Sequence, residues 1–469
     1  MSEYKLLING ELVDGDGVDL DVINPATEKP VSVLSVATAD QLEQAVAAAK
    51  AAFPGWSGTP VARRKELLEA AVKRINDNAD QIAELIVAEQ GKPLELAKVE
   101  LFLSDLFANY FANQEITAEV LVDDDAQHAA IHRKPLGVVA CIMPWNFPFV
   151  QAVYKMAPAL ITGNTVVLKP SPFTPLSTLK LGELIADIFP PGVVNIIADN
   201  NDLGPAITSH PDVAMVAFTG STATGKAIMK SASSTMKRVT LECGGNDAGI
   251  VLDDADPKKI APGIFGGAFM NSGQVCVALK RLYVPEGMYD ELCNELAELA
   301  KNSTVGDGMN PATQFGPVQN KGQFEKVKGY INDARSNGTI IAGGEIPDGP
   351  GYFLPLTVVR DIHDGTRVVD EEPFGPILPI LKYSDLDDAI ARANNSPYGL
   401  GGSVWSSNFE RAQEVASRLE CGTAWINQHP AFAPNIPFPA SKESGLGVEW
   451  GTAGLEEYTT MQVVNAARG

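Results

Sequence analysis

The sequence predicts an α/β protein with two doubly wound sheets and a small additional β element. From about residue 136, short unbroken runs rich in Val and Ile alternate with helical stretches. Such runs are typical of strands buried on both faces of a parallel sheet, and strands separated by helices imply right-handed βαβ units. The chain also has 469 residues, too many for one core, and a second strand–helix series begins near residue 245.

The N-terminal part, to about residue 115, is predicted to be helical after one short strand. Thr38 and Gln41 form a capping-box pattern in front of apolar residues at helical spacing. A long helical pattern then runs from Pro60 to a stop at Gly91.

Six apolar runs are predicted to be strands, at 137–143, 164–170, 192–198, 213–220, 238–245 and 248–254. Because the second series starts where the fifth run ends, we expect two units. The first comprises residues 1–117 and 134–244, and the second comprises residues 245–430.

Two segments fit neither unit. Residues 118–133 have the pattern of a projecting hairpin with an acidic turn at 123–125, and residues 455–469 hold a short helix and then an apolar strand. Exposed strands are usually paired, so we expect subunit contacts at both segments. The alternative is that both pack on their own chain.

Charge and cysteine content limit the partners and the compartment. The chain has 36 Lys and Arg against 58 Asp and Glu, a net charge of −22, which disfavours nucleic acid and anionic membranes but allows a small anionic cofactor in a local pocket. The five cysteines form no CxxC pattern, so neither a disulfide framework nor a metal site is expected. With no secretory signal and no apolar run of about 18 residues, a cytoplasmic location is expected.

Cys276 and Glu242 are candidates for covalent and acid–base chemistry. Cys276 follows small polar residues and Gly273, an approach that suits a presented nucleophile, although a single cysteine is more often a small buried apolar residue. Glu242 ends an apolar strand before two glycines, where burial would make its carboxylate a general base, and a solvated loop charge is the alternative.

Three further positions lie at the ends of predicted strands. Asn146, fixed between prolines in PWNFP (144–148), is suited to stabilising an oxyanion, unless the segment is only a structural turn. The segment TGSTATGK (219–226) opens a helical pattern whose free amides could hold a pyrophosphate, although it matches neither GxGxxG nor a Walker motif. Lys169 ends a strand at the sheet edge where doubly wound folds bind ligands, and a surface lysine is the alternative.

Taken in order, these motifs resemble the aldehyde dehydrogenase superfamily over essentially the whole chain. Lys169 falls 23 residues after Asn146, and Cys276 falls 34 residues after Glu242, as in that family's pattern. The matching motifs are PWNFP (144–148), NTVVLKPS (164–171), FTGST (218–222), LECGG (241–245), NSGQVC (271–276), EEPFGP (371–376), SPYGLGGSVWS (396–406) and PFPASKESGLG (437–447).

The resemblance implies a Rossmann-like cofactor domain, an α/β catalytic domain with the cysteine nucleophile, and a small bridging and oligomerisation element that supports a homodimer or homotetramer. It implies NAD(P)-dependent oxidation of an aldehyde to the acid through a thiohemiacetal and a thioester. Cys276 would be the nucleophile, Glu242 the base that activates the hydrolytic water, and Asn146, with the Cys276 backbone N–H, the oxyanion hole. The implied cofactor contacts are Met143, Trp145, Lys169, Ser171, Gly220, Ser221, Glu372 and Phe374.

The resemblance also places a substrate tunnel, whose matching positions are apolar or aromatic. The loop 428–438 has no evident arginine that could bind a second carboxylate. The apolar lining and this lack of arginine favour an uncharged aliphatic or aromatic aldehyde as the substrate. A semialdehyde of the succinate type stays open, because other loops could supply the charge. The matching positions are Phe147, Val150, Tyr154, Val275, Val277, Phe432 and Phe438.

Three positions depart from the family's pattern. Cys243 and Asn246 replace the usual Leu and Lys after Glu242, so Cys243 would be either an oxidation-sensitive second thiol or an inert buried one. The usual PFGG element is changed at 437–440, which removes no catalytic group. Pro172 stands where an acidic ribose ligand is frequent, which makes NADP as well as NAD a candidate.

Three other classes of protein remain as alternatives, one of which is a structural protein that keeps the fold without turnover; the intact Cys276, Glu242 and Asn146 count against it. An acylating enzyme that passes the thioester to coenzyme A would not need Glu242. A papain-like hydrolase would need a histidine beside Cys276, and none of the five histidines lies near the motifs in sequence.

Overall fold

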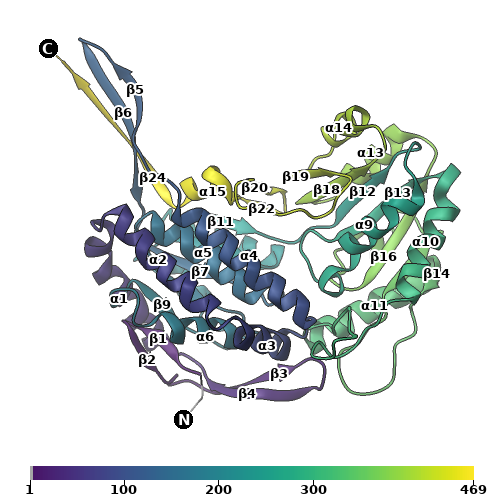
Figure 1. The fold of residues 1–469 in the computed structure, drawn as a ribbon, viewed down its shortest axis with the longest axis horizontal. Helices are drawn as coiled ribbons and strands as arrows, with labels where there is room; N and C mark the ends of the chain where they lie inside the picture. The colour runs from purple at the N-terminus through teal and green to yellow at the C-terminus, as the bar shows by residue number, and fades with distance from the viewer. Residues whose placement is uncertain (1–3, 469) are drawn as a thin grey trace.

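The computed structural model of the protein describes residues 4–468, so residues 1–3 and 469 of the expected ranges lie outside it. Two large sheets lie next to each other, and a three-stranded arm projects from the first (Figure 1). The predicted fold class, α/β with two sheets and a smaller β element, is confirmed.

The first sheet has the order β2-β1-β9-β8-β7-β10-β11-β22. Its five central strands are parallel, and the chain reverses direction across the sheet between β7 and β10. Ligands of doubly wound folds bind beyond the carboxyl ends of the strands at such a reversal. The strands are β1 (Leu6–Ile8), β2 (Glu11–Val13), β7 (Val138–Ile142), β8 (Thr165–Lys169), β9 (Val194–Ile196), β10 (Val213–Thr219), β11 (Arg238–Glu242) and β22 (Gly445–Leu446).

The six predicted strand runs are confirmed, since each coincides with one strand to within a few residues, the sixth being β12 (Asp247–Val251). The expectation of one N-terminal strand is wrong. Besides β1 and β2, a hairpin of β3 (Asp19–Asn24) and β4 (Lys29–Ser35) precedes the first helix.

Helices cover the first sheet. α5 and α6 contact it, and α2, α3 and α4 pack against these two helices (Figure 1). The helices are α1 (Ala39–Ser57), α2 (Val61–Asn76), α3 (Ala79–Gln90), α4 (Leu94–Ala112), α5 (Pro148–Ile161), α6 (Leu176–Ile185), α7 (Gly204–Ser209) and α8 (Thr222–Ala232).

The helical pattern from Pro60 to Gly91 forms two helices, not one. The Asn78 amide donates to the Arg74 carbonyl oxygen at 2.8 Å, a local bond that competes with the helix ladder and ends α2. The predicted stop is confirmed, since Gly91 caps α3 with φ +94°, and Thr38 and Gln41 form the predicted capping box of α1.

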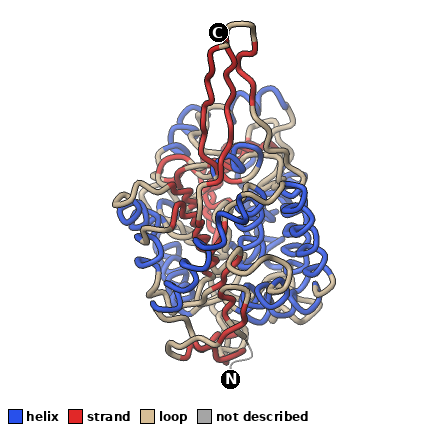
Figure 2. Tube along the Cα trace, turned by 90° about the vertical axis from the view of Figure 1, so that its left-hand side faces the viewer, coloured by secondary structure: helices blue, strands red, loops and turns tan. Residues whose placement is uncertain are grey.

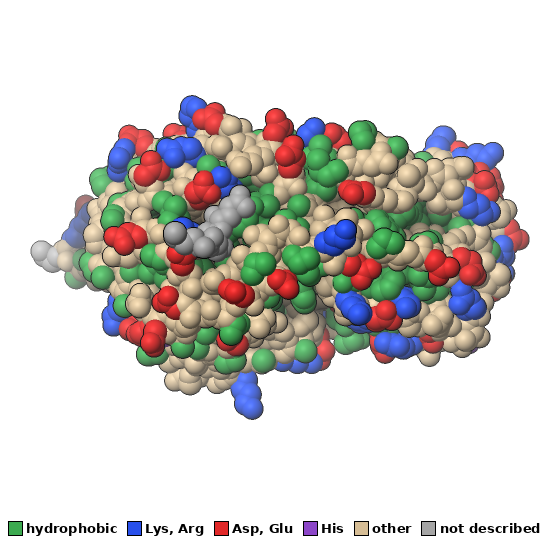
Figure 3. Space-filling view, turned by 90° about the horizontal axis from the view of Figure 1, so that it is seen from below, with side chains coloured by type: hydrophobic (Ala, Val, Ile, Leu, Met, Phe, Trp, Pro, Cys, Tyr) green, Lys and Arg blue, Asp and Glu red, His purple; other side chains and the backbone are tan. Residues whose placement is uncertain are grey.

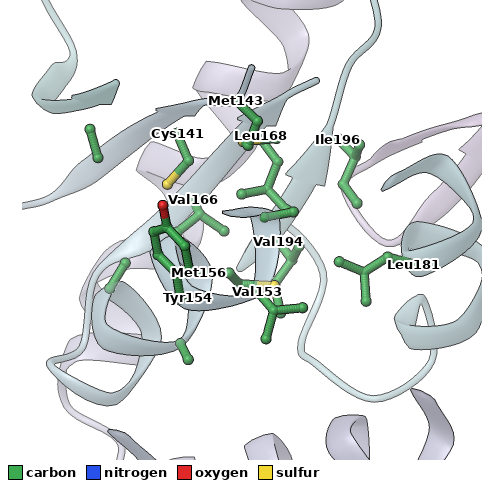
Figure 4. Packing of buried hydrophobic residues seen from close by; sticks show 14 of the residues in the cluster. Cys141, Met143, Val153, Tyr154, Met156, Val166, Leu168, Leu181, Val194 and Ile196 are labelled. Atoms are coloured by element: carbon green, nitrogen blue, oxygen red, sulfur yellow. The ribbon is translucent and has the colours of Figure 1, made fainter. Parts of the chain in front are cut away.

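The core of the first sheet is closely packed and apolar. Side chains from β7, β8 and β9 interdigitate with those of α5 and α6, as Figure 4 shows for Cys141, Val166 and Leu168. These strands are buried on both faces, which explains why their sequences lack polar alternation.

The second sheet has the order β14-β15-β16-β13-β12-β18-β19 and spans residues 247–426. Its strands fall within the range 245–430, although the boundary at residue 245 stays a prediction. Besides β12, the strands are β13 (Leu279–Pro285), β14 (Thr339–Ala342), β15 (Thr357–Arg360), β16 (Ile377–Tyr383), β18 (Gly401–Trp405) and β19 (Thr423–Ile426). The helices are α9 (Pro257–Phe269), α10 (Tyr289–Lys301), α11 (Lys321–Asn337), α12 (Arg367–Asp370), α13 (Leu386–Asn394) and α14 (Phe409–Ala416).

The arm is formed by the predicted hairpin and the predicted tail strand. β5 (Glu119–Asp123) and β6 (Gln127–Pro135) form the hairpin, and β24 (Thr459–Ala467) pairs with β6 along its length, after α15 (Gly451–Glu457). The two segments therefore pair with each other within one chain, and the sheet extends away from the body (Figure 2). β5 and β24 leave two edges without a strand partner among residues 4–468.

Short two-stranded pieces complete the structure: β17 (Tyr398–Gly399) with β21 (Ser441–Lys442), and β20 (Phe438–Pro439) with β23 (Val448–Glu449). Within residues 4–468, no helix combines the length and apolar character needed to cross a membrane.

Candidate active site

Three cavities with shared walls lie at the reversal point of the first sheet. The largest, about 530 Å³, extends over the ends of β7, β8 and β10 and the start of α8. It shares Trp145 and Ser221 with a second cavity of about 160 Å³. The second shares Asn146 and Cys276 with a third, mostly apolar cavity, the tunnel, so Cys276 lies on the wall that these two cavities have in common.

The largest cavity contains six of the eight residues expected to bind the cofactor, namely Met143, Trp145, Lys169, Ser171, Gly220 and Ser221. Lys169 is buried, not a surface lysine, and its ammonium donates to Asp199 Oδ1 at 2.6 Å. Asp199 lies outside the motifs and could not be identified from the sequence.

The start of α8 lies against this cavity. Ser221 is the N-cap, and its hydroxyl accepts from the Thr224 N–H at 3.2 Å. The first N–H groups of a helix lack intrahelical partners and favour anions, so this end suits a pyrophosphate.

Glu372 and Phe374 line the second cavity with Cys243 and Cys276. Glu372 Oε1 accepts from the Gly245 N–H at 3.1 Å, and burial raises the pKa of this carboxyl to about 7. A Cβ at Gly244 would lie 2.3 Å from Glu372 Oε2, so the glycine makes room for the carboxylate. Trp145 and Phe374 meet edge to face at 5.2 Å and form an aromatic wall.

The segment before Cys276 has an unusual backbone. Asn271, Ser272 and Gly273 all have positive φ, at 51°, 55° and 70°. A Cβ at Gly273 would lie 2.2 Å from the Gly375 carbonyl oxygen, so only glycine fits this turn. This left-handed turn ends the helical stretch after α9 and directs the chain back to Cys276.

Cys276 is a protonated thiol in this setting. Burial, and then the negative charge of Glu242, raise the pKa of Cys276 well above its usual value. The thiol therefore needs a proton acceptor before it can act as a nucleophile.

Glu242 is buried at the end of β11 and lines the tunnel. Neither carboxylate oxygen has a hydrogen-bond partner among the described residues. Burial, and then the charge of Glu449, raise the pKa of Glu242 well above its usual value, while Lys155 opposes the shift. Glu242 is thus an enclosed carboxyl poised to exchange a proton, not a solvated loop charge.

Asn146 lines both the second cavity and the tunnel, and its amide nitrogen donates to the Gln274 carbonyl oxygen at 2.9 Å. One amide hydrogen is left for a ligand. The Asn146 carbonyl oxygen accepts from Lys92 Nζ at 2.9 Å and from Asn271 Nδ2 at 3.1 Å.

A fully buried ion pair fixes the position of Asn146. Lys92 Nζ lies 2.5 Å from Glu100 Oε2, and Glu100 Oε1 accepts the N–H groups of Phe149 and Val150 at the start of α5. Neither Lys92 nor Glu100 lies in a recognisable motif, so this support could not be predicted from local sequence patterns.

The tunnel is lined by six of the seven expected residues, namely Phe147, Val150, Tyr154, Val275, Phe432 and Phe438. Val277 is the exception: its side chain is fully buried in the core of the first sheet. Leu103, Phe107, Gln151, Glu449 and Trp450 also line the tunnel and were not anticipated. Of these five residues, only Gln151 could have been identified from the sequence, because its helical spacing places it on the same face as Phe147 and Tyr154.

His429 approaches the nucleophile segment although it is distant in sequence. Its Nε2 donates to the Val277 carbonyl oxygen at 2.7 Å, and burial lowers the pKa of His429 to about 4. No hydrogen bond joins His429 to Cys276 among the described residues, so the Cys–His pair of a papain-like hydrolase is not present.

Cys243 is buried beside α8, and a Cβ at Gly225 would lie 2.6 Å from its Sγ. Burial raises the pKa of Cys243 to about 12, which keeps it a protonated thiol. Within residues 4–468, all five cysteines are free, and no cluster of three or more His, Cys, Asp or Glu could hold a metal ion.

Comparison with known proteins gives consistent matches over the whole chain. Residues 12–464 match the profile of the aldehyde dehydrogenase family. A putative aldehyde dehydrogenase, FUS7, of Gibberella moniliformis is 41% identical over 92% of both chains, and a betaine aldehyde dehydrogenase of Rhizobium etli is 37% identical over 98% of this chain and 97% of its own.

A solved structure agrees with these matches. The NAD+ complex of an aldehyde dehydrogenase from Bacillus cereus superimposes with a TM-score of 0.96 at 37% identity, covering 99% of this chain and 96% of its own. The protein thus belongs to the aldehyde dehydrogenase family.

Proposed function

We propose that the protein oxidises an uncharged aldehyde to the carboxylic acid with a nicotinamide dinucleotide, through a covalent adduct on Cys276. The observation that supports this most strongly is the position of Cys276, on the shared wall of the cofactor-side cavity and an apolar tunnel. Asn146 and Glu242 line the tunnel beside it.

The first chemical step is addition of the Cys276 thiolate to the aldehyde carbonyl. The thiol proton passes to an acceptor, and Glu242 is the enclosed carboxylate beside it once ionised. The free amide hydrogen of Asn146 and the Cys276 N–H stabilise the oxygen of the resulting thiohemiacetal. When bound, NAD(P)+ supplies the acceptor for the hydride that leaves this adduct.

The second step is hydrolysis of the thioester left on Cys276. Glu242 takes a proton from water, the hydroxide adds to the thioester carbonyl, and the acid leaves as the thiol re-forms. The buried, unpaired carboxyl of Glu242 supports this role.

The residues of the largest cavity fit NAD or NADP. The N-terminus of α8 provides amides for the pyrophosphate, and Lys169 and Ser171 line the region for the adenosine ribose. Glu372 and Phe374 would hold the nicotinamide ribose and ring. No carboxylate lines the largest cavity, and Pro172 supplies none, so a 2′-phosphate meets no repelling acid. NADP is therefore accepted as well as NAD.

An uncharged substrate is supported by the charges in the tunnel. Its lining includes two carboxylates, Glu242 and Glu449, and no Lys, Arg or His. An anionic semialdehyde of the succinate type would find no free counter-charge in this lining, because Lys155 is already paired with Glu449, so it ranks second. Transfer of the thioester to coenzyme A ranks third, because Glu242 is in place to activate water.

The two sheets contribute different parts of the site. Residues 1–117 and 134–244 form the cofactor-binding unit, and residues 245–430 present Cys276 from the second. The arm, residues 118–133 and 455–469, joins subunits of a homodimer or homotetramer, since its strands expose Val120, Leu121 and Val463. A cytoplasmic location agrees with the five free cysteines.

An aldehyde panel assayed with both cofactors tests this proposal. Reduced nicotinamide should form with uncharged aldehydes and either cofactor, free acid should be the product, and added coenzyme A should yield no acyl-CoA. A Cys276→Ala variant should lose all aldehyde-dependent reduction. Strong preference for a dicarboxylic semialdehyde, or unchanged activity of the variant, contradicts the proposal.

A further inference from the structure

Gln151 is one of several neutral side chains in the tunnel with unused hydrogen-bonding capacity, the others being Asn146, Thr219 and Trp450. Gln151 lies on α5 one helical turn beyond Phe147, about 6 Å further along the axis, and it lines the tunnel. The side chain is 6% exposed. It is therefore a buried amide in a wall whose largest side chains are aromatic.

The orientation of the Gln151 amide is fixed from one end. The Tyr154 hydroxyl donates to Gln151 Oε1 at 2.6 Å. The amide nitrogen donates to no described residue, and it is not among the fully enclosed unpartnered atoms, so it faces the tunnel. The oxygen of this amide already accepts a hydrogen bond, and its nitrogen has no acceptor. The nitrogen can therefore donate a hydrogen bond to a bound ligand.

The side chains around the Gln151 amide are mainly apolar and aromatic, and they suit a flat apolar ring. Trp450 stacks on Phe438 with centroids 4.6 Å apart and meets Phe107 at 4.9 Å, and Phe147 and Phe432 complete the lining. Among residues 4–468, no free cation lines the tunnel, and the nearby Lys155 is already paired with Glu449, so an anionic group would have no counter-charge there. The acceptor that Gln151 can meet is therefore neutral.

We propose that the substrate class is an aromatic aldehyde with an uncharged oxygen acceptor on its ring, such as an aryl methyl ether, and that Gln151 Nε2 selects it. This inference rests on the proposed function. Asn146 holds the aldehyde oxygen near Cys276, and Gln151 meets the substituent at the other side of the ring. A substrate without the acceptor leaves the buried amide unpaired, which is the kind of mismatch that discriminates strongly.

Matched substrate pairs test the inference. The 3- and 4-methoxybenzaldehydes are compared with the 3- and 4-ethylbenzaldehydes, which have the same shape without the oxygen, and hexanal serves as a non-aromatic reference. For at least one ring position, kcat/KM should favour the methoxy compound by about tenfold. In Gln151→Met, the ratio of the two kcat/KM values should fall to that of an oxygen-blind tunnel whatever the absolute rates, and a circular dichroism spectrum matching the wild type shows that the variant folds.

A second variant tests the role of Tyr154. Tyr154→Phe frees the Gln151 oxygen, so the ratio of methoxy to ethyl kcat/KM should fall, whatever the absolute rates. The electronic effect of the methoxy group on the carbonyl cancels, because each preference is compared between variants with the same two substrates.

The outcomes separate the two proposals. Equal methoxy-to-ethyl ratios in the wild type and Gln151→Met, or oxidation of hexanal but of no aromatic aldehyde, overturn the inference and leave the proposed function intact. Oxidation of none of these aldehydes overturns the proposed function itself, and the inference with it.

Discussion

Glu242 illustrates how burial sets the chemistry of a single residue. Its carboxyl has no partner, and burial together with Glu449 raises its pKa well above the usual value. Hydrolysis needs the carboxylate, so we predict that kcat falls with acidification through this raised pKa, at higher pH than an ordinary glutamate would give.

Glu449→Gln provides the comparison, because it removes the charge that raises the pKa of Glu242 and leaves Lys155 to lower it. The acid limb of the pH–kcat profile should move to lower pH. An acid limb at the same pH in both proteins would mean that another group controls the rate.

Single residues also show where sequence patterns stop being informative. Cys276, Glu242 and Asn146 stand out because small or rigid neighbours surround them, and the structure places all three around one tunnel. Gln151, Glu449 and Trp450 lie in the same lining but in ordinary helical or loop sequence. Their proximity depends on long-range packing, so no local pattern could identify them.

Between elements, the buried pair Lys92–Glu100 connects the loop before α4, α4 itself and the start of α5. Both side chains are fully buried. The pair supports the segment that contains Asn146 by bonding three backbone groups, namely the Asn146 carbonyl oxygen and the N–H groups of Phe149 and Val150. Glu100→Ala would leave the Lys92 ammonium buried without its counter-charge. We predict a loss of about 3–5 kcal/mol in the free energy of unfolding, measured by urea denaturation.

The matched control lies on the same helix. Glu95 and Lys98 form an exposed pair near the start of α4, so Glu95→Ala should leave the urea midpoint almost unchanged. Equal effects of the two substitutions would show that the buried pair has no special role.

The arm is the second element-scale feature. β24 occupies one full side of β6, and its outward residues Met461, Val463 and Val464 are exposed. Deleting residues 459–469 removes this strand and uncovers β6. We predict that the truncated protein loses self-association in sedimentation velocity experiments, while an unchanged sedimentation coefficient would place the subunit contact elsewhere.

Elements were predictable to the extent that their signals were local. The unbroken Val and Ile runs identified β7 to β12 because those strands are buried on both faces. The break between α2 and α3 was missed because the periodicity continues across it while Asn78 bonds back to Arg74. The pairing of β24 with β6 joins segments that are distant in sequence, and no local pattern encodes it.

Across the whole molecule, buried acids couple stability to pH. Asp247 shows this most clearly, since burial raises its pKa to about 8 from an ordinary 3.8. The groups facing it are the Gly401 N–H on Oδ1 and neutral His429, whose Nε2 lies 3.6 Å from Oδ2, with Arg281 and Glu372 further away.

The sign of this coupling follows from proton binding. The folded protein keeps a proton on Asp247 that the unfolded chain releases above about pH 4, so this stabilisation is lost as pH rises to about 8. Asp247→Asn keeps an acceptor for the Gly401 N–H but takes no proton. We predict a smaller fall in the urea midpoint between about pH 5 and pH 8.5 in the variant. An identical fall would contradict this assignment.

The net charge of −22 describes the surface as a whole and not the site. Figure 3 shows acidic and basic side chains interspersed on one face, with no continuous basic region there. The proposed phosphate contacts lie instead within a cavity at the start of α8 and beside Lys169. The net charge of the chain therefore disfavours polyanionic partners, while the local arrangement of α8 and Lys169 determines whether a cofactor can bind.

In the proposed reaction Cys276 forms the covalent adduct and Glu242 releases it. The most direct test is a rapid-mixing experiment on Glu242→Gln with excess aldehyde and cofactor, followed by peptide mass analysis. We predict about one equivalent of reduced nicotinamide per subunit, formed more slowly than in the wild type because the variant lacks the carboxylate that takes the thiol proton, then little further turnover and an acyl group on the peptide that contains Cys276. Sustained turnover at the wild-type rate, or an acyl group on any other residue, would contradict it.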